Sequence, residues 1–226
     1  MNILKLTIMV SIVGVVGGCE KQSNTKLAHA YFKMAFTELG DDADPVAAHK
    51  RALVSINKAL ELQEKAEYYA LKATVLFNLG DSALSQTCYQ KALALQPEQA
   101  MRGEIVNNYA CLLAHQKQYD QARTMWKGLT KDALYQTPEV AFVNLGRLYA
   151  EEKNYMAAKE SFQNAVHIAP SYLDAQYYLG LMAHKLGDSQ LAAKQTKMLL
   201  SLEPTHQGAQ WLAAQLRLDV PGSDEA

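Results

Sequence analysis

The sequence predicts an all-α protein built from repeated helix hairpins, and three observations lead to this prediction. Ala, Leu, Gln, Glu and Lys dominate the chain, whereas Gly (12 residues) and Pro (6 residues) are sparse. Runs of β-branched residues are rare after residue 16. Turn and packing residues recur at a distance of 34 residues: Pro170 with Pro204, and Leu145-Gly146 with Leu179-Gly180. A fixed period of this length indicates stacked helix pairs.

The overall composition is that of an ordinary folded protein. The chain has 226 residues, of which 49% are hydrophobic and 20% charged, so it can bury a substantial core. Its 22 basic and 23 acidic residues nearly cancel, which leaves no concentrated positive charge for nonspecific binding to nucleic acid. We therefore expect neither global disorder nor a nucleic-acid partner.

The first nineteen residues have the pattern of a bacterial lipoprotein signal. Lys5 precedes an apolar run over residues 6–16, which is shorter than the roughly 20 residues that a membrane-spanning helix needs. The run ends in Val16-Gly17-Gly18-Cys19, which resembles the lipobox recognised by lipoprotein signal peptidase. A chance cysteine after a signal or signal-anchor sequence is the alternative. We expect cleavage after a signal peptide of residues 1–18.

The lipobox resemblance implies that Cys19 carries the lipid. Each buried methylene of the acyl chains would contribute about 0.8 kcal/mol to membrane binding, so the lipid alone would be a stable anchor. Glu20, in place of Asp, favours delivery to the outer membrane of a Gram-negative bacterium. Residues 19–25 then read as a lipidated tether that holds a periplasmic body close to the bilayer. In that oxidising compartment Cys88 and Cys111 could pair or could remain unpaired packing residues.

Residues 139–172 contain the fullest copy of the repeat. The large residues Phe142, Tyr149 and Phe162 can fill the space between two antiparallel helices, and Gly146 and Ala158 are small where the helix axes approach. Pro170 lacks a backbone N–H and so ends the second helix. These positions and the 34-residue period resemble the tetratricopeptide repeat.

The tetratricopeptide resemblance implies a right-handed superhelix of about five helix hairpins closed by a C-terminal helix. The same frame divides the body into repeats at 26–65, 66–99, 103–138, 139–172 and 173–206, followed by a cap at 206–218. On the cap, Trp211, Leu212 and Leu216 share the side expected to cover the open end of the stack. Residues 219–226 are predicted to be a disordered tail.

The concave surface of such a superhelix is lined by the first helix of each repeat, and we expect the partner to bind there. The candidate groove residues, one or more from each repeat, are Phe32, Phe36, Leu39, Phe77, Asn107, Arg147 and Tyr177. Phe32, Phe36 and Leu39 lie at i, i+4 and i+7 on a helix that is apolar around most of its circumference. This stripe is either an open groove for an apolar segment or a face that packs on the second repeat.

Motifs of enzymes and metal sites are absent from the sequence. The six His residues include no pair at i, i+3 or i, i+4, and no CxxC, GxSxG, P-loop or GxGxxG motif occurs. We predict a binding protein that is not an enzyme, with no catalytic residues, no metal and no cofactor.

Several stretches resemble the type IV pilus biogenesis lipoproteins PilF and PilW, the pilotins. They are Asn107–Leu113, Gln116–Ala122, Leu134–Pro138, Asn144–Gly146 and Ala209–Leu212 with Leu216–Leu218. The resemblance implies an adaptor that binds the outer-membrane secretin of the type IV pilus and promotes its localisation and multimerisation. It also implies an apolar groove in the first repeats. The alternative is a general envelope adaptor, similar to NlpI, that docks periplasmic peptidases or peptidoglycan hydrolases.

Overall fold

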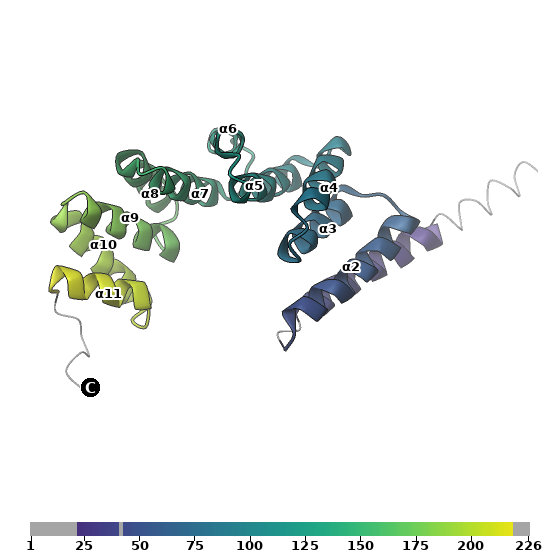
Figure 1. The fold of residues 1–226 in the computed structure, drawn as a ribbon, viewed down its shortest axis with the longest axis horizontal. Helices are drawn as coiled ribbons and strands as arrows, with labels where there is room; N and C mark the ends of the chain where they lie inside the picture. Colours follow the sequence, from purple (N-terminus) through teal and green to yellow (C-terminus); the bar gives the residue numbers. More distant parts are fainter. Residues whose placement is uncertain (1–21, 41–42, 219–226) are drawn as a thin grey trace, which may run out of the picture. The chain divides into compact units, whose positions relative to one another are not determined.

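The computed structural model describes residues 22–40 and 43–218, and in these ranges all regular structure is helical (Figure 1). The predicted signal peptide, Cys19 and the predicted tail at 219–226 lie outside the described residues. The all-α prediction is confirmed for the described part of the protein. The right-handed sense of the superhelix stays a prediction.

The helices follow one another as antiparallel pairs joined by short turns. The first helix covers residues 22–39, and the others follow in the order α2 (Pro45–Leu62), α3 (Ala66–Asn78), α4 (Ser82–Ala94), α5 (Gln99–His115), α6 (Tyr119–Leu129), α7 (Pro138–Glu151), α8 (Tyr155–Ile168), α9 (Leu173–Lys185), α10 (Ser189–Leu202) and α11 (Gln207–Leu216). We number the hairpins from the first helix with α2, so that α7 and α8 form the fourth. Helix α11 follows the fifth hairpin and contacts α9 and α10.

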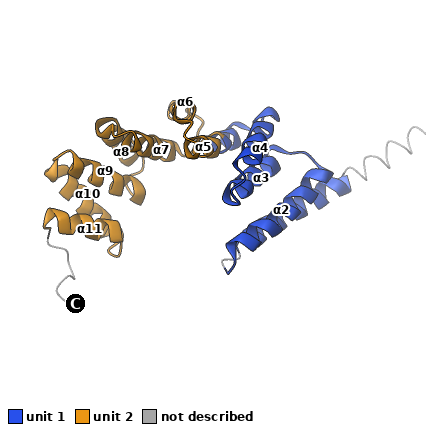
Figure 2. Cartoon of the chain, viewed as in Figure 1, with its two compact units in different colours: residues 1–105 blue, residues 106–226 orange. Residues whose placement is uncertain are grey.

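The protein divides into two compact units, residues 1–105 and residues 106–226 (Figure 2). Unit 1 contains the first two hairpins and the beginning of α5. Unit 2 contains the rest of α5 and the helices α6 to α11. The boundary between the two units falls within α5.

Short polar side chains begin the second helix of four hairpins. The side chains of Asp44, Asp81, Asn154 and Asp188 each accept a hydrogen bond from the backbone N–H three residues ahead, at 3.0–3.2 Å. Such caps satisfy backbone donors that have no partner within the helix. The repeated cap fixes where each second helix starts, and so sets the length of the hairpin turn.

The fourth hairpin packs as the repeat pattern predicts. The Phe162 ring is fully buried, and a Cβ added to Gly146 would lie only 2.6 Å from it. Phe142 and Tyr149 are partly buried against the same cluster, which also includes Ala158. The absence of a side chain at Gly146 therefore makes room for the ring of the facing helix.

Two helix bounds differ from the predicted segment bounds, and one burial prediction is wrong. Residues 22–25, assigned to the tether, are helical, and α5 begins at Gln99 instead of residue 103. Both extensions are short helical segments with exposed polar residues at Gln22, Ser23, Gln99 and Arg102, and they carry no apolar periodicity for the sequence to reveal. On α11, Leu212 is buried as expected, but Trp211 is 49% exposed because the buried face is centred on Ala209, Leu212 and Ala213.

Candidate functional site

The three apolar groove candidates of the first helix are used unequally by the fold. The Phe32 ring lies 4.7 Å from the ring of Tyr68 on α3 and packs beside the buried Ala28 and Ala59. Leu39 is partly buried against a cluster that contains Ala35 and Val75. Phe32 and Leu39 therefore serve the packing of the first hairpin on α3.

Phe36 remains open to a partner. Its ring meets the Phe32 ring edge-on, at 5.0 Å between centroids and 87° between planes, and its side chain is 54% exposed. Phe77 on α3, the remaining apolar candidate of unit 1, is partly buried. The stripe of the first helix thus divides into a packed part, Phe32 and Leu39, and an exposed aromatic side chain, Phe36.

Further apolar side chains are exposed on the first hairpin. Leu27 and Met34 lie on the first helix, and Val46 and Val54 lie on α2. Lys26, Lys33, Lys50 and Arg51 are also exposed on these two helices. The hairpin therefore presents apolar side chains among basic ones, a combination that suits an amphipathic partner.

Asn107 was predicted to face the groove, but the structure buries it to 6% exposure. Its amide oxygen accepts hydrogen bonds from Trp126 Nε1 of α6 at 3.1 Å and from Asn144 Nδ2 of α7 at 3.0 Å. A buried amide that joins three helices is a structural element of unit 2, because its polar atoms already have partners. The groove prediction is corrected at this residue.

Arg147, the next candidate, lies beside a pocket in unit 2. The pocket has a volume of about 410 Å³, within the range of small-ligand sites. Its lining comes from α5, α6, α7 and the turn between α5 and α6, and consists of Cys111, Ala114, His115, Lys117, Tyr119, Trp126, Asn144, Arg147, Leu148 and Glu151.

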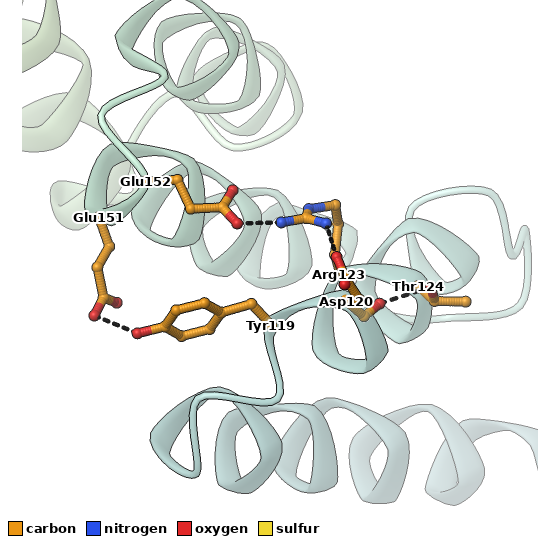
Figure 3. Close-up of polar contacts among 6 residues, drawn as sticks. All are labelled: Tyr119, Asp120, Arg123, Thr124, Glu151 and Glu152. Carbon is orange, nitrogen blue, oxygen red and sulfur yellow. Dashed lines mark hydrogen bonds and ion pairs between the residues drawn. The ribbon is translucent and has the colours of Figure 1, made fainter.

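Polar contacts join α6 to α7 beside this pocket (Figure 3). The Tyr119 hydroxyl donates a hydrogen bond to Glu151 Oε1 at 2.6 Å, and this bond raises the pKa of Tyr119. Arg123 forms ion pairs with Glu152 of α7 and with Asp120 of its own helix. These contacts fix the end of α7 against the start of α6 and thereby hold the pocket walls in place.

The thiol of Cys111 is neutral at physiological pH. Burial raises its pKa to about 11, although the nearby Arg147 acts in the opposite direction. Cys111 and Cys88 are both free in this structure. The pocket therefore holds no thiolate that would repel an anion or attract a metal ion.

Arg147 and Tyr177 are connected through the aromatic side chain of Tyr178. The guanidinium carbon of Arg147 lies 5.8 Å from the Tyr178 ring, and the Tyr177 ring lies 5.2 Å from the same ring. Tyr177 is partly buried and packs on His206, 5.3 Å away. Of the four groove candidates outside the first helix, only Arg147 is exposed.

Metal-binding clusters and membrane-spanning helices are absent from the described part of the protein. Residues 22–40 and 43–218 contain no group of three or more His, Cys, Asp and Glu side chains that could hold a metal ion. In the same ranges, no helix has the length and apolar character needed to cross a membrane.

The sequence pattern did not predict several side chains that line the pocket. Lys117 and Tyr119 lie at the turn between α5 and α6, and Glu151 ends α7. A repeat frame treats Tyr119 as a packing position and gives Lys117 and Glu151 no role. The order of the repeats could have indicated this arrangement. In stacked hairpins, the turn between α5 and α6 lies beside the end of α7, which brings these polar residues together.

Two tetratricopeptide repeat family models match the sequence, one over residues 66–99 and the other over residues 143–202. The first range coincides with the predicted second repeat, and the second begins in α7 and ends with α10. The chain therefore contains tetratricopeptide repeats in these two ranges. The predicted fold class is therefore confirmed.

Among curated proteins, the chain is homologous to the type IV pilus assembly protein PilF of Pseudomonas aeruginosa. The two are 31% identical over 120 residues, which is 53% of this chain and 46% of PilF. The matched region thus spans about half the length of that relative.

Solved structures show the same fold. The Pseudomonas aeruginosa PilF structure matches with a TM-score of 0.74 and 22% identity, covering 86% of this chain and 84% of PilF. PilW, described as a widely conserved type IV pilus biogenesis factor, matches with a TM-score of 0.63 and 20% identity over 90% of this chain and 95% of its own. YrrB, a repeat protein with a peptide-binding site, matches with a TM-score of 0.57 and 21% identity over 81% of this chain and 90% of its own.

Proposed function

We propose that this protein is a type IV pilus biogenesis adaptor of the pilotin type, a binding protein without enzymatic activity. In this proposal it binds secretin subunits of the pilus and promotes their localisation to the outer membrane and their multimerisation. The observation that carries the proposal is the 31% identity with the pilus assembly protein PilF over 120 residues. The similar folds of PilF and PilW support it.

The partner surface in this proposal is the exposed part of the first hairpin. On the first helix, the exposed Phe36 ring contacts the Phe32 ring. Phe32 in turn packs against Tyr68. A ring that is fixed on one edge and exposed elsewhere loses little conformational freedom when a partner covers it. Aromatic anchors of this kind commonly dominate the binding energy of protein interfaces.

The proposed location is the outer membrane, with the lipid on Cys19 and the repeat body in the periplasm. Residue 22, the first that the structure describes, is already helical and lies three residues after this cysteine. A lipid on Cys19 would therefore keep the first hairpin near the bilayer, where a subunit destined for the membrane must arrive.

The test measures secretin multimers in separated inner and outer membranes of the host. Deletion of the gene should leave secretin as monomers, or as multimers in the inner membrane, and Cys19→Ala should reproduce the mislocalisation. Phe36→Ala should weaken capture of secretin by the full-length protein by about tenfold or more, while Met156→Ala, which removes another exposed apolar side chain, should not.

Normal secretin multimers in the outer membrane of the deletion strain would contradict the proposal. Capture of peptidases or peptidoglycan hydrolases without secretin would instead support the general envelope adaptor. The two adaptor hypotheses are separated by identifying the captured proteins, because both predict a lipid-anchored binding module.

A further inference from the structure

The pocket between α5, α6 and α7 has two basic side chains that no carboxylate of the described residues neutralises. The Arg147 guanidinium rests against the Tyr178 ring, and no carboxylate or carbonyl among the described residues accepts its N–H groups. The Lys117 ammonium likewise has no ion-pair partner within residues 22–40 and 43–218. Both side chains line the pocket and are exposed.

The single acidic side chain that lines the pocket is already engaged. Glu151 accepts the hydrogen bond that the Tyr119 hydroxyl donates, so the one carboxylate in the pocket lining already has a partner (Figure 3). The thiol of Cys111 is neutral and adds no negative charge. With Lys117, Arg147 and Glu151 charged, the lining has a net positive charge.

The remaining lining combines a fixed amide with apolar surface. The amide nitrogen of Asn144 donates to Asn107 Oδ1 and to Cys111 Sγ, and its amide oxygen accepts no hydrogen bond among the residues that the structure describes. Ala114, Trp126 and Leu148 supply apolar wall. A pocket with a guanidinium, an amide and apolar walls suits a short peptide segment that carries an acidic group.

We propose that this pocket of unit 2 binds a carboxylate of an extended protein segment, with Arg147 as the bidentate donor and Lys117 as the second positive charge. Asn144 would meet the backbone of the same segment. The carboxylate belongs either to an Asp or Glu side chain or to the free C-terminus of the partner. The inference does not depend on the pilus proposal, because it concerns a different unit and a different chemistry from the exposed Phe36 of the first hairpin.

A protein carboxylate fits the pocket better than a small free anion does. Lys117 and Arg147 are open to solvent, where the attraction of an isolated anion is weakened by water and salt. The apolar walls and the amide add binding energy only for a ligand that carries a backbone and side chains. Inorganic phosphate should therefore compete poorly with a bound peptide.

The experiment selects binders from random peptide libraries on the full-length protein purified in mild detergent. One library has free C-termini, and the other is fused at its C-terminus so that only side chains supply carboxylates. The variant is the double substitution Arg147→Gln and Lys117→Gln. The matched control is Lys131→Gln with Lys153→Gln, which makes the same change of charge at exposed positions outside the pocket lining.

The expected result is enrichment of an acidic group at a fixed position among peptides selected by the wild type and by the control. The pocket variant should lose this enrichment and bind the selected peptides at least about tenfold more weakly, since hydrogen bonds to charged groups are involved. Enrichment in only one library identifies the source of the carboxylate.

Four outcomes would overturn the proposal: no selected peptides, selected peptides without acidic enrichment, enrichment that persists in the pocket variant, or inorganic phosphate that displaces the peptides at equal concentration. Melting temperatures from circular dichroism guard against a trivial loss of fold, because the pocket variant should melt with the control. If the variant melts early, Arg147→Lys replaces it and should retain part of the binding.

Discussion

The first and fourth hairpins of the protein bury their apolar side chains in different ways. In the fourth hairpin, the large ring of Phe162 is fully enclosed and Gly146 is fitted to it. In the first hairpin, most fully buried side chains are alanines, at positions 28, 35, 48, 52 and 59. Ile56 is also fully buried, but five larger apolar side chains of this hairpin are exposed: Leu27, Met34, Phe36, Val46 and Val54.

This difference separates two uses of apolar surface. The fourth hairpin uses its largest side chain for stability, because enclosing an aromatic ring removes a large apolar area from water. The first hairpin buries mainly alanines and leaves several of its larger apolar side chains exposed. An apolar side chain that contributes little to the fold is free to contribute to binding.

The largest expected effect comes from removing the two phenylalanines in turn. Phe162→Ala should lower the free energy of unfolding by about 3–5 kcal/mol, because it leaves a cavity in a fully packed core. Phe36→Ala should lower it by less than about 1 kcal/mol, since more than half of that side chain is already in water. Urea unfolding followed by circular dichroism measures both.

The comparison between hairpins fails if the two substitutions cost similar amounts. A large loss for Phe36→Ala would mean that its edge-on contact with Phe32 is part of the core. The assignment of Phe36 to a binding surface would then lose its basis, and the exposed apolar side chains of α2, Val46 and Val54, would become the better candidates.

The second prediction tests the fit of Gly146 against the Phe162 ring. Gly146→Ala should destabilise unit 2 by about 1 kcal/mol or more, because overpacking costs about 1–3 kcal/mol and the gain in helix propensity offsets only part of it. Gly128→Ala on α6 is the control, since a Cβ there has nothing within 4 Å. That change should stabilise the protein by about 0.5–1 kcal/mol. Equal signs for the two substitutions would show that Phe162 moves aside freely.

The sequence predicted this fit because the repeat pattern encodes pairs that face each other. Gly146 and Phe162 occupy positions at which size alone decides whether two helices can approach, so the residue types were informative. Asn107 was misassigned because the same pattern places it on the groove side, while its burial depends on Trp126 and Asn144 from two other helices. Partners distant in sequence cannot be read from a position within one repeat.

The pocket around Arg147 shows the same limit. The repeat frame suggested an exposed arginine but not the lysine, tyrosine and glutamate that surround it, because Lys117, Tyr119 and Glu151 come from turns and helix ends. For the first helix, the sequence left open whether Phe32 and Phe36 pack or bind. In the structure Phe32 packs and Phe36 is exposed, because Tyr68 contacts the Phe32 ring and not the Phe36 ring.

The smallest expected effects concern polar bridges between neighbouring helices in the two units. Arg123 and Glu152 join α6 to α7, and the amide nitrogen of Asn78 lies 2.9 Å from His49 Nε2, joining α3 to α2. Glu152→Gln and Asn78→Ala should each cost less than about 1 kcal/mol, because partly exposed polar contacts replace similar contacts with water.

The Arg123–Glu152 and Asn78–His49 contacts should respond differently to salt. The cost of Glu152→Gln should shrink in about 1 M salt, where the screening length falls to about 3 Å, whereas the cost of Asn78→Ala should not change, since that contact involves no ion pair. Melting temperatures at low and high salt measure both, with Glu160→Gln as a control for removing an exposed acid from α8. A salt-independent loss above about 1 kcal/mol for Glu152→Gln would mean that the α6–α7 contact depends on a desolvated ion pair. The α6 and α7 walls of the Arg147 pocket would then depend mainly on this charge pair.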